Sequence, residues 1–107
     1  MKRAEQLAIN EKVMKAIEEY NACNEVLVLE GRLRSCSANV YRKGKYYVLE
    51  SYRTFIAFID TETDTCYDFL RYVYGFTSTS AQHIAKFRRD YGAGKWGCER
   101  ELRYYSV

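Results

Sequence analysis

Residues 38–60 read ANVYRKGKYYVLESYRTFIAFID, and this stretch decides the fold. β-Branched and aromatic residues stand on both sides of the dipeptide Lys43-Gly44, a pattern typical of two strands joined by a tight turn. Residues 54–60, TFIAFID, are apolar on both alternating faces, as expected for a central strand covered above and below. The sequence therefore predicts an antiparallel sheet built around this segment.

The part of the chain before this stretch predicts one helix and one ambiguous segment. In residues 4–22, apolar side chains recur at helical spacing, which predicts an amphipathic helix. These side chains are Leu7, Val13, Met14, Ile17 and Tyr20. Residues 25–38, EVLVLEGRLRSCSA, begin with adjacent apolar residues and contain a glycine. That pattern allows either a short strand or a helical turn.

The part of the chain after this stretch predicts at least one more strand. Residues 61–65, TETDT, form a polar turn, and residues 66–76, CYDFLRYVYGF, resume the strand pattern until it stops near Gly75. Because the links are short, three or four antiparallel strands are expected in meander order. The tail ELRYYSV, residues 101–107, is a candidate edge strand.

Residues 77–84, TSTSAQHI, are predicted to open a second helix. Thr79 or Ser80 suits the N-cap, and Thr79 with Gln82 matches a capping box. One stripe of this helix carries Ser80, Ile84, Phe87 and Tyr91, and Gly92 follows as a stop. The expected fold is a single α+β domain over residues 1–107. It has an N-terminal helix, an antiparallel sheet of three to five strands, and a second helix packed on one face.

Composition narrows the class of protein. The chain has 107 residues, of which 48% are hydrophobic and 29% charged, which suits one folded domain with a modest core and excludes intrinsic disorder. No apolar window suggests a signal peptide or a membrane span, so we expect a soluble protein inside the cell. Cys23, Cys36, Cys66 and Cys98 include no C-x-x-C pair, and His83 is the only imidazole. We therefore expect reduced thiols, with no metal site and no cofactor.

Hydroxyl side chains and the single histidine could meet where sheet and second helix touch. The predicted polar cluster comprises Ser51, Tyr52, Thr54, Thr79, Ser80 and His83. A helix N-terminus can receive a phosphate or carboxylate, so the cluster could bind an anionic ligand. Alternatively, the hydroxyls cap the helix and His83 hydrogen-bonds to the strand, locking helix to sheet. The spacing nominates no group to orient a nucleophile and its base, so no catalytic residue is expected.

Tyrosines and cations supply the candidate interaction surface. The chain contains 11 tyrosines, more than a small core needs, and rigid aromatic side chains with polar tips suit protein interfaces. The expected surface is drawn from Tyr41, Arg42, Lys43, Lys45, Tyr46, Arg53, Tyr72, Tyr74, Lys86, Arg88 and Arg89. Cations beside aromatic rings can also stack bases and neutralise phosphates. A solvated hairpin face explains the cations equally well, and strand positions favour tyrosine in any case.

Two motifs in the middle of the chain carry a family resemblance. The first is SYRTFIA at residues 51–57, and the second is Y-x-x-T-x-T-S-x-x-H-I-x-x-F from Tyr74 to Phe87. Over residues 46–92 the chain resembles a family of small proteins encoded by phages and mobile elements of Firmicutes. The family has no established activity, but the resemblance implies a setting in which small non-enzymatic proteins counter host defence or modulate host machinery.

Together these observations favour a non-enzymatic interaction protein of a phage or mobile element. It is expected to bind and inhibit a host factor, for example as an anti-CRISPR or other anti-defence protein, in the cytoplasm of the bacterial host cell. Its expected partner is a host protein or nucleoprotein complex, with a homodimer also allowed and no membrane involved. The alternative is a nucleic-acid-binding or nucleotide-binding module that uses the basic hairpin and the second helix.

Overall fold

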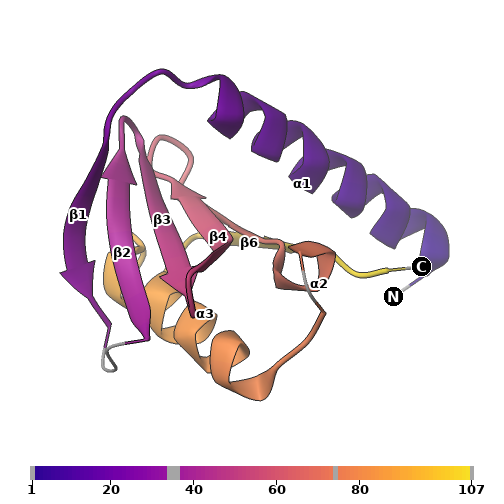
Figure 1. The fold of residues 1–107 in the computed structure, drawn as a ribbon. Coiled ribbons are helices and arrows are strands. Elements are labelled where there is room, and N and C mark those ends of the chain that lie inside the picture. Colours follow the sequence, from indigo (N-terminus) through magenta and orange to yellow (C-terminus); the bar gives the residue numbers. More distant parts are fainter. Residues whose placement is uncertain (1, 34–36, 74, 107) are drawn as a thin grey trace.

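The protein is described by a computed structural model that covers residues 2–33, 37–73 and 75–106. Its elements are α1 (Arg3–Ala22), β1 (Leu27–Arg32), β2 (Ala38–Lys43), β3 (Tyr46–Ser51), β4 (Thr54–Asp60), β5 (Thr65–Asp68), α2 (Leu70–Val73), α3 (Ser78–Tyr91) and β6 (Arg100–Arg103). The strands form one sheet in the order β1-β2-β3-β4-β5-β6, and α1 and α3 pack against it (Figure 1). The α+β class and the N-terminal helix are therefore confirmed.

The sheet differs from the prediction in size and direction. It has six strands rather than three to five, and β6 runs parallel to β5, so the sheet is mixed rather than antiparallel. The cause is α3, which lies between β5 and β6 in the sequence. This helix returns the chain to the end of the sheet at which β5 begins. A strand that follows such a helical crossover starts from the same end as the strand before it, and the two run parallel.

The first part of the ambiguous segment after α1 is a strand, and residues 34–36 of that segment lie outside the described residues. Leu27–Arg32 forms β1 and pairs antiparallel with β2, with a register shift between Leu29 and Gly31. Its residues are almost all exposed, so β1 gains its order from backbone pairing more than from side-chain burial. Apolar and polar residues alternate along a strand only when one of its faces is buried. Because β1 is exposed on both faces, its sequence lacks this alternation and could not distinguish a strand from a helical turn.

The strand predicted over residues 66–76 is wrong in its second half. β5 ends at Asp68, and the short helix α2 begins at Leu70. The reason is local: a side-chain oxygen of Asp68 accepts a hydrogen bond from the backbone N–H of Leu70, 3.1 Å away. This side chain satisfies a free N–H at the start of a helical turn and so favours the turn over a continued strand.

The second helix begins earlier than predicted. Its N-cap is Thr77, whose hydroxyl accepts from the N–H of Ser80 at 3.3 Å, so Thr79 and Ser80 lie inside α3 and the capping box is wrong. Thr77 keeps an extended backbone, whereas the helix starts at Ser78. The predicted stripe does face the sheet, since Ser80, Ile84 and Phe87 are buried, and the helix ends at Gly92 as expected.

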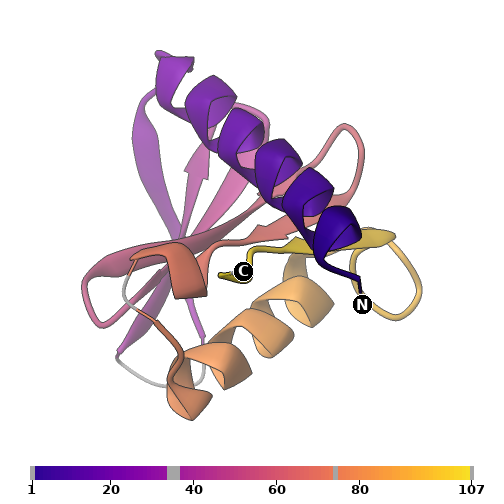
Figure 2. The ribbon, with the colours of Figure 1, turned by 90° about the vertical axis from the view of Figure 1, so that its right-hand side faces the viewer.

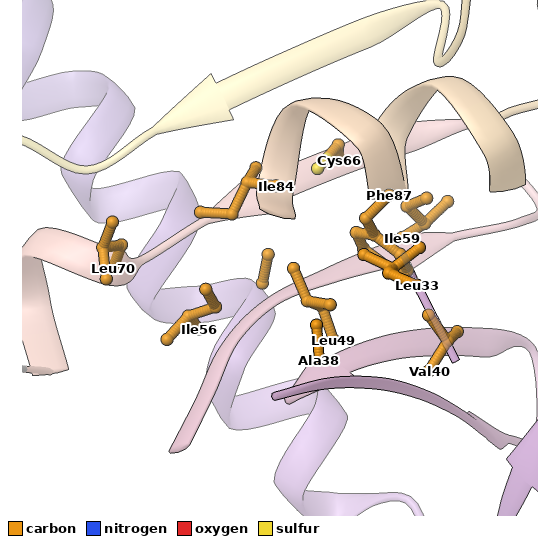
Figure 3. Close-up of a cluster of buried hydrophobic side chains, with 11 residues drawn as sticks. Leu33, Ala38, Val40, Leu49, Ile56, Ile59, Cys66, Leu70, Ile84 and Phe87 are labelled. Carbon is orange, nitrogen blue, oxygen red and sulfur yellow. The ribbon is translucent and has the colours of Figure 1, made fainter. Parts of the chain in front are cut away.

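The sheet has a core on each face. On the α3 side, Ile84 and Phe87 pack with strand residues such as Ile59, a cluster that Figure 3 shows in close-up. On the α1 side, Val13 and Ala16 pack with a second cluster around Phe58. The view in Figure 2 shows α1 and α3 running past opposite sides of the sheet. The strand β4 supplies both cores, because Phe58 belongs to one cluster and Ile59 to the other.

Candidate functional site

Three members of the predicted polar cluster meet between β3 and α3. The hydroxyl oxygen of Ser51 lies 2.8 Å from Nδ1 of His83 and 3.0 Å from the hydroxyl oxygen of Ser80. Ser51, at the end of β3, and Ser80, in the first turns of α3, are both fully buried. These hydrogen bonds join the helix to the sheet in the way the structural interpretation of the cluster predicts.

Burial decides what this cluster can do chemically. A serine beside an imidazole has the residue types of a nucleophile and its base, but the Ser51 side chain has 0% exposure. A substrate atom therefore cannot reach its hydroxyl in this conformation. Burial also lowers the pKa of His83 below its ordinary value of 6.5, which favours the neutral ring beside the two serines. The geometry fits a positioning contact between helix and strand.

The other three members of the predicted cluster lie at its border or outside it. Tyr52 reaches the border, because its ring centroid lies 5.9 Å from that of His83. Tyr52 and Arg53 form the turn between β3 and β4 and have φ of 50° and 67°, a conformation that costs energy in residues other than glycine. Thr54 is half-buried and Thr79 exposed, and neither takes part in the two hydrogen bonds of Ser51.

The cations of the hairpin are held by neighbouring groups. The Lys45 ammonium lies 3.2 Å from Asp60 and 3.1 Å from Glu62, and these carboxylates raise the pKa of Lys45, the hydrogen bond to Glu62 contributing most. Lys43 lies 4.2 Å from the centre of the Tyr20 ring, and Arg42 lies over the ring of Tyr47. The carboxylates of Asp60 and Glu62 therefore lie beside the Lys45 ammonium. Their negative charge disfavours the binding of a polyanion at this hairpin.

The cations of the second helix are also largely paired. Lys86 lies 2.8 Å from Asp90 in an i,i+4 pair, and Arg88 bonds to Glu101 of β6. The same glutamate accepts from Arg103 at 2.6 Å, so α3 and β6 share a charge network. Arg53 and Arg89 are exposed and have no ion pair with any described residue. Isolated cations of this kind do not make the continuous basic patch of a nucleic-acid site.

The predicted tyrosine surface is only partly at the surface. Tyr46 is buried, with 4% exposure, and packs edge-on against Tyr20 and Phe58, so its place on the interaction surface is wrong. It lies at the start of β3 on the face that α1 covers, where an aromatic ring fills the core. Tyr41 is half-buried beside Phe55. Tyr74 lies outside the described residues.

Tyr72 is the exposed member of the set that leads to a larger surface. It has 48% exposure, and its ring packs edge-on against Tyr104, with centroids 5.2 Å apart. Tyr104 in turn lines a groove of about 710 Å³ between α1 and the C-terminal segment. The groove is lined by Leu7, Asn10, Glu11, Met14, Lys15, Glu18, Tyr104 and Ser106. This groove is a candidate binding surface on the described part of the chain.

The sequence contained a partial indication of this groove. Leu7 and Met14 belong to the apolar stripe of the amphipathic helix predicted over residues 4–22. In the structure Val13 is buried against the sheet, whereas Leu7 remains 42% exposed and lines the groove. The stripe is wider than the face that the sheet covers. An apolar stripe of that width leaves side chains for a second contact.

Comparison of the chain with models of protein families, with curated proteins and with solved structures finds no match. Among the described residues, no three His, Cys, Asp or Glu side chains are placed to hold a metal ion. Within the same part of the chain, no helix is long and apolar enough to cross a membrane. The functional argument therefore rests on the surfaces themselves.

Proposed function

We propose that this is a non-enzymatic interaction protein that binds another protein in the groove along α1. The observation that carries the proposal is the groove lined by the exposed Leu7 and the half-buried Tyr104, whose ring packs against the exposed Tyr72. Exposed tyrosines beside aliphatic side chains supply large contact area at low entropic cost, as in protein interfaces. The groove itself is lined by elements at the two ends of the chain, α1 and the residues after β6, and Tyr72 of α2 lies beside it.

The lining of the groove indicates the chemistry of its occupant. Leu7, Met14 and Tyr104 offer apolar contact, while Glu11, Lys15 and Glu18 carry charge of both signs. A groove of this kind suits a partner segment with one apolar side and polar flanks, such as an amphipathic helix. The mixed charges disfavour a nucleic acid, because a polyanion would meet two carboxylates here.

The biological role follows from the family resemblance. The motifs at residues 51–57 and 74–87 resemble small proteins of phages and mobile elements, so the proposed partner is a factor of the bacterial host. Within this proposal, binding inhibits that factor, with CRISPR components and other defence proteins as the first candidates. The proposed location is the cytoplasm of the host cell.

The test is a capture experiment with purified tagged protein in host lysate, repeated after nuclease treatment. We expect a protein partner that survives nuclease and moderate salt and is lost from the variants Tyr72→Ala and Leu7→Lys. Tyr52→Ala is the matched control, because Tyr52 is similarly exposed, at 52%, but lies on the β3–β4 turn. Capture that needs nucleic acid and weakens steeply with salt would instead support the nucleic-acid alternative.

A further inference from the structure

The two edges of the sheet are treated differently by the rest of the chain. At the β6 edge, the backbone N–H of Tyr104 donates to the backbone carbonyl of Asp68 in β5. The backbone groups of the neighbouring Arg103 and Tyr105 therefore point away from β5. The side-chain amides of α1 bind them: Gln6 donates to the Arg103 carbonyl at 3.0 Å, and Asn10 donates to the Tyr105 carbonyl at 2.7 Å. Tyr105 donates its own N–H back to Asn10 at 3.1 Å. This edge is covered.

The β1 edge is open and apolar. β1 is the outermost strand on its side, and no part of the described chain lies beyond it (Figure 1). Val26, Leu27, Val28 and Leu29 have exposures of 75%, 40%, 55% and 56%. Edge strands of soluble proteins usually carry charges, prolines or short lengths that prevent pairing with another chain. The charges and the register shift of β1 begin only after Leu29, so its first half, with Val26 before it, carries exposed apolar residues and none of these features.

We propose that β1 pairs with β1 of a second copy, antiparallel across a two-fold axis, to form one continuous sheet of two chains. The geometry is self-consistent. Leu27 and Leu29 pair with Lys43 and Tyr41 of β2, so both point to the same face of the sheet, while Val28 points to the other. An axis at Val28 places Leu27 of each copy opposite Leu29 of the other and gives two apolar cross-strand pairs on one face.

Charge at the ends of the strand favours a second copy in this direction. The acidic Glu25 precedes the apolar residues, and the basic Arg32 ends β1. Antiparallel pairing brings Glu25 of one copy close to Arg32 of the other at both ends of the interface. Parallel pairing would place each charge beside its like. The strand is therefore complementary to itself, and this interface is separate from the groove along α1.

The first test is the mass of the full chain in solution, measured by sedimentation equilibrium over a range of concentrations. We expect a reversible dimer, weakened about tenfold or more by Val28→Lys, which places two lysines opposite each other, or by Leu29→Lys, which places a charge against Leu27 of the second copy. Both side chains are exposed in the single chain, so the variants should fold, and circular dichroism checks this. Leu7→Lys, in the α1 groove, is the matched control and should leave the dimer intact.

A charge exchange tests the direction of pairing. Glu25→Arg alone should weaken the dimer, and the double variant Glu25→Arg with Arg32→Glu should restore it. A chain that stays monomeric at all concentrations, or a dimer that Leu29→Lys does not weaken, overturns the proposal. A dimer lost in Tyr72→Ala and retained in Leu29→Lys would place the self-contact in the groove and overturn it as well. Because the capture experiment uses Tyr72 and Leu7, failure of either proposal leaves the other standing.

Discussion

At the residue scale, the contact of His83 with Ser51 links two segments that are far apart in the sequence. Nδ1 of His83 lies 2.8 Å from the Ser51 hydroxyl, which is itself 3.0 Å from Ser80. A buried hydroxyl group costs free energy unless it is hydrogen-bonded, so the three side chains stabilise one another. The residue types were visible in the sequence. Their convergence depends on the strand and helix meeting, and Thr79 was wrongly included because the helix start was misplaced.

This residue pair predicts a loss of stability in mild acid. Burial lowers the pKa of His83 below 6.5, so the unfolded chain binds a proton more readily than the folded chain does. The contribution of His83 to the free energy of unfolding is therefore complete above about pH 6.5. It is lost as pH falls through the lower pKa that His83 has in the folded chain. NMR titration can follow this ring directly, because the chain has a single histidine. Urea denaturation should show that the free energy of unfolding falls more between pH 7.5 and pH 5.5 for the wild type than for His83→Gln. A measured pKa at or above 6.5 would contradict the interpretation.

At the element scale, the sequence predicted what depends on local patterns and missed what depends on distant contacts. The helical spacing of the first helix, the hairpin at Lys43-Gly44 and the apolar run at residues 54–60 are local, and all three appear in the structure. The parallel strand β6 is not local. Its position depends on Asp64, which accepts from the N–H groups of Ala93 and Glu99 and so holds the loop before β6 beside β5. A short polar segment carries no pattern that reveals such a partner.

The attachment of α1 to β6 gives a prediction at this scale. Asn10 is buried and binds both the N–H and the carbonyl of Tyr105. Asn10→Ala leaves two backbone groups without their partner and should lower the free energy of unfolding by about 2 kcal/mol. Urea denaturation measures this loss, and Lys12→Ala, at an exposed position on the same helix, should change stability by less than about 0.5 kcal/mol. Hydrogen exchange localises the effect, since the Tyr105 amide should exchange faster in Asn10→Ala. Unchanged exchange there would show that the hydrogen bond contributes nothing.

At the scale of the whole molecule, the described part of the chain combines two cores with the two surfaces proposed for binding. The cores lie on opposite faces of the sheet, and the proposed surfaces are the α1 groove and the β1 edge. Neither surface was predicted as such. The groove joins Leu7 to Tyr104 across almost the whole chain, and the exposure of β1 depends on its outermost place in the sheet. Both are properties of topology, which a composition rich in tyrosine can suggest but cannot locate.

The two cores should nevertheless unfold together. β4 carries Phe58 on the α1 side and Ile59 on the α3 side, so neither core can lose this strand without the other. Val13→Ala, on the α1 side, should cost about 2 kcal/mol, and Ile59→Val, on the α3 side, about 1 kcal/mol, because each removes fully buried methyl groups. Denaturation followed by far-ultraviolet and near-ultraviolet circular dichroism should give coincident curves in both variants, each shifted as a whole. In Val13→Ala, the far-ultraviolet signal of the helices could instead be lost at lower denaturant than the near-ultraviolet signal of the packed aromatic rings. That result would show that α1 unfolds independently of the sheet and that the groove exists only while α1 is folded. Coincident curves would mean that a partner bound in the groove stabilises the entire sheet, including the β1 edge.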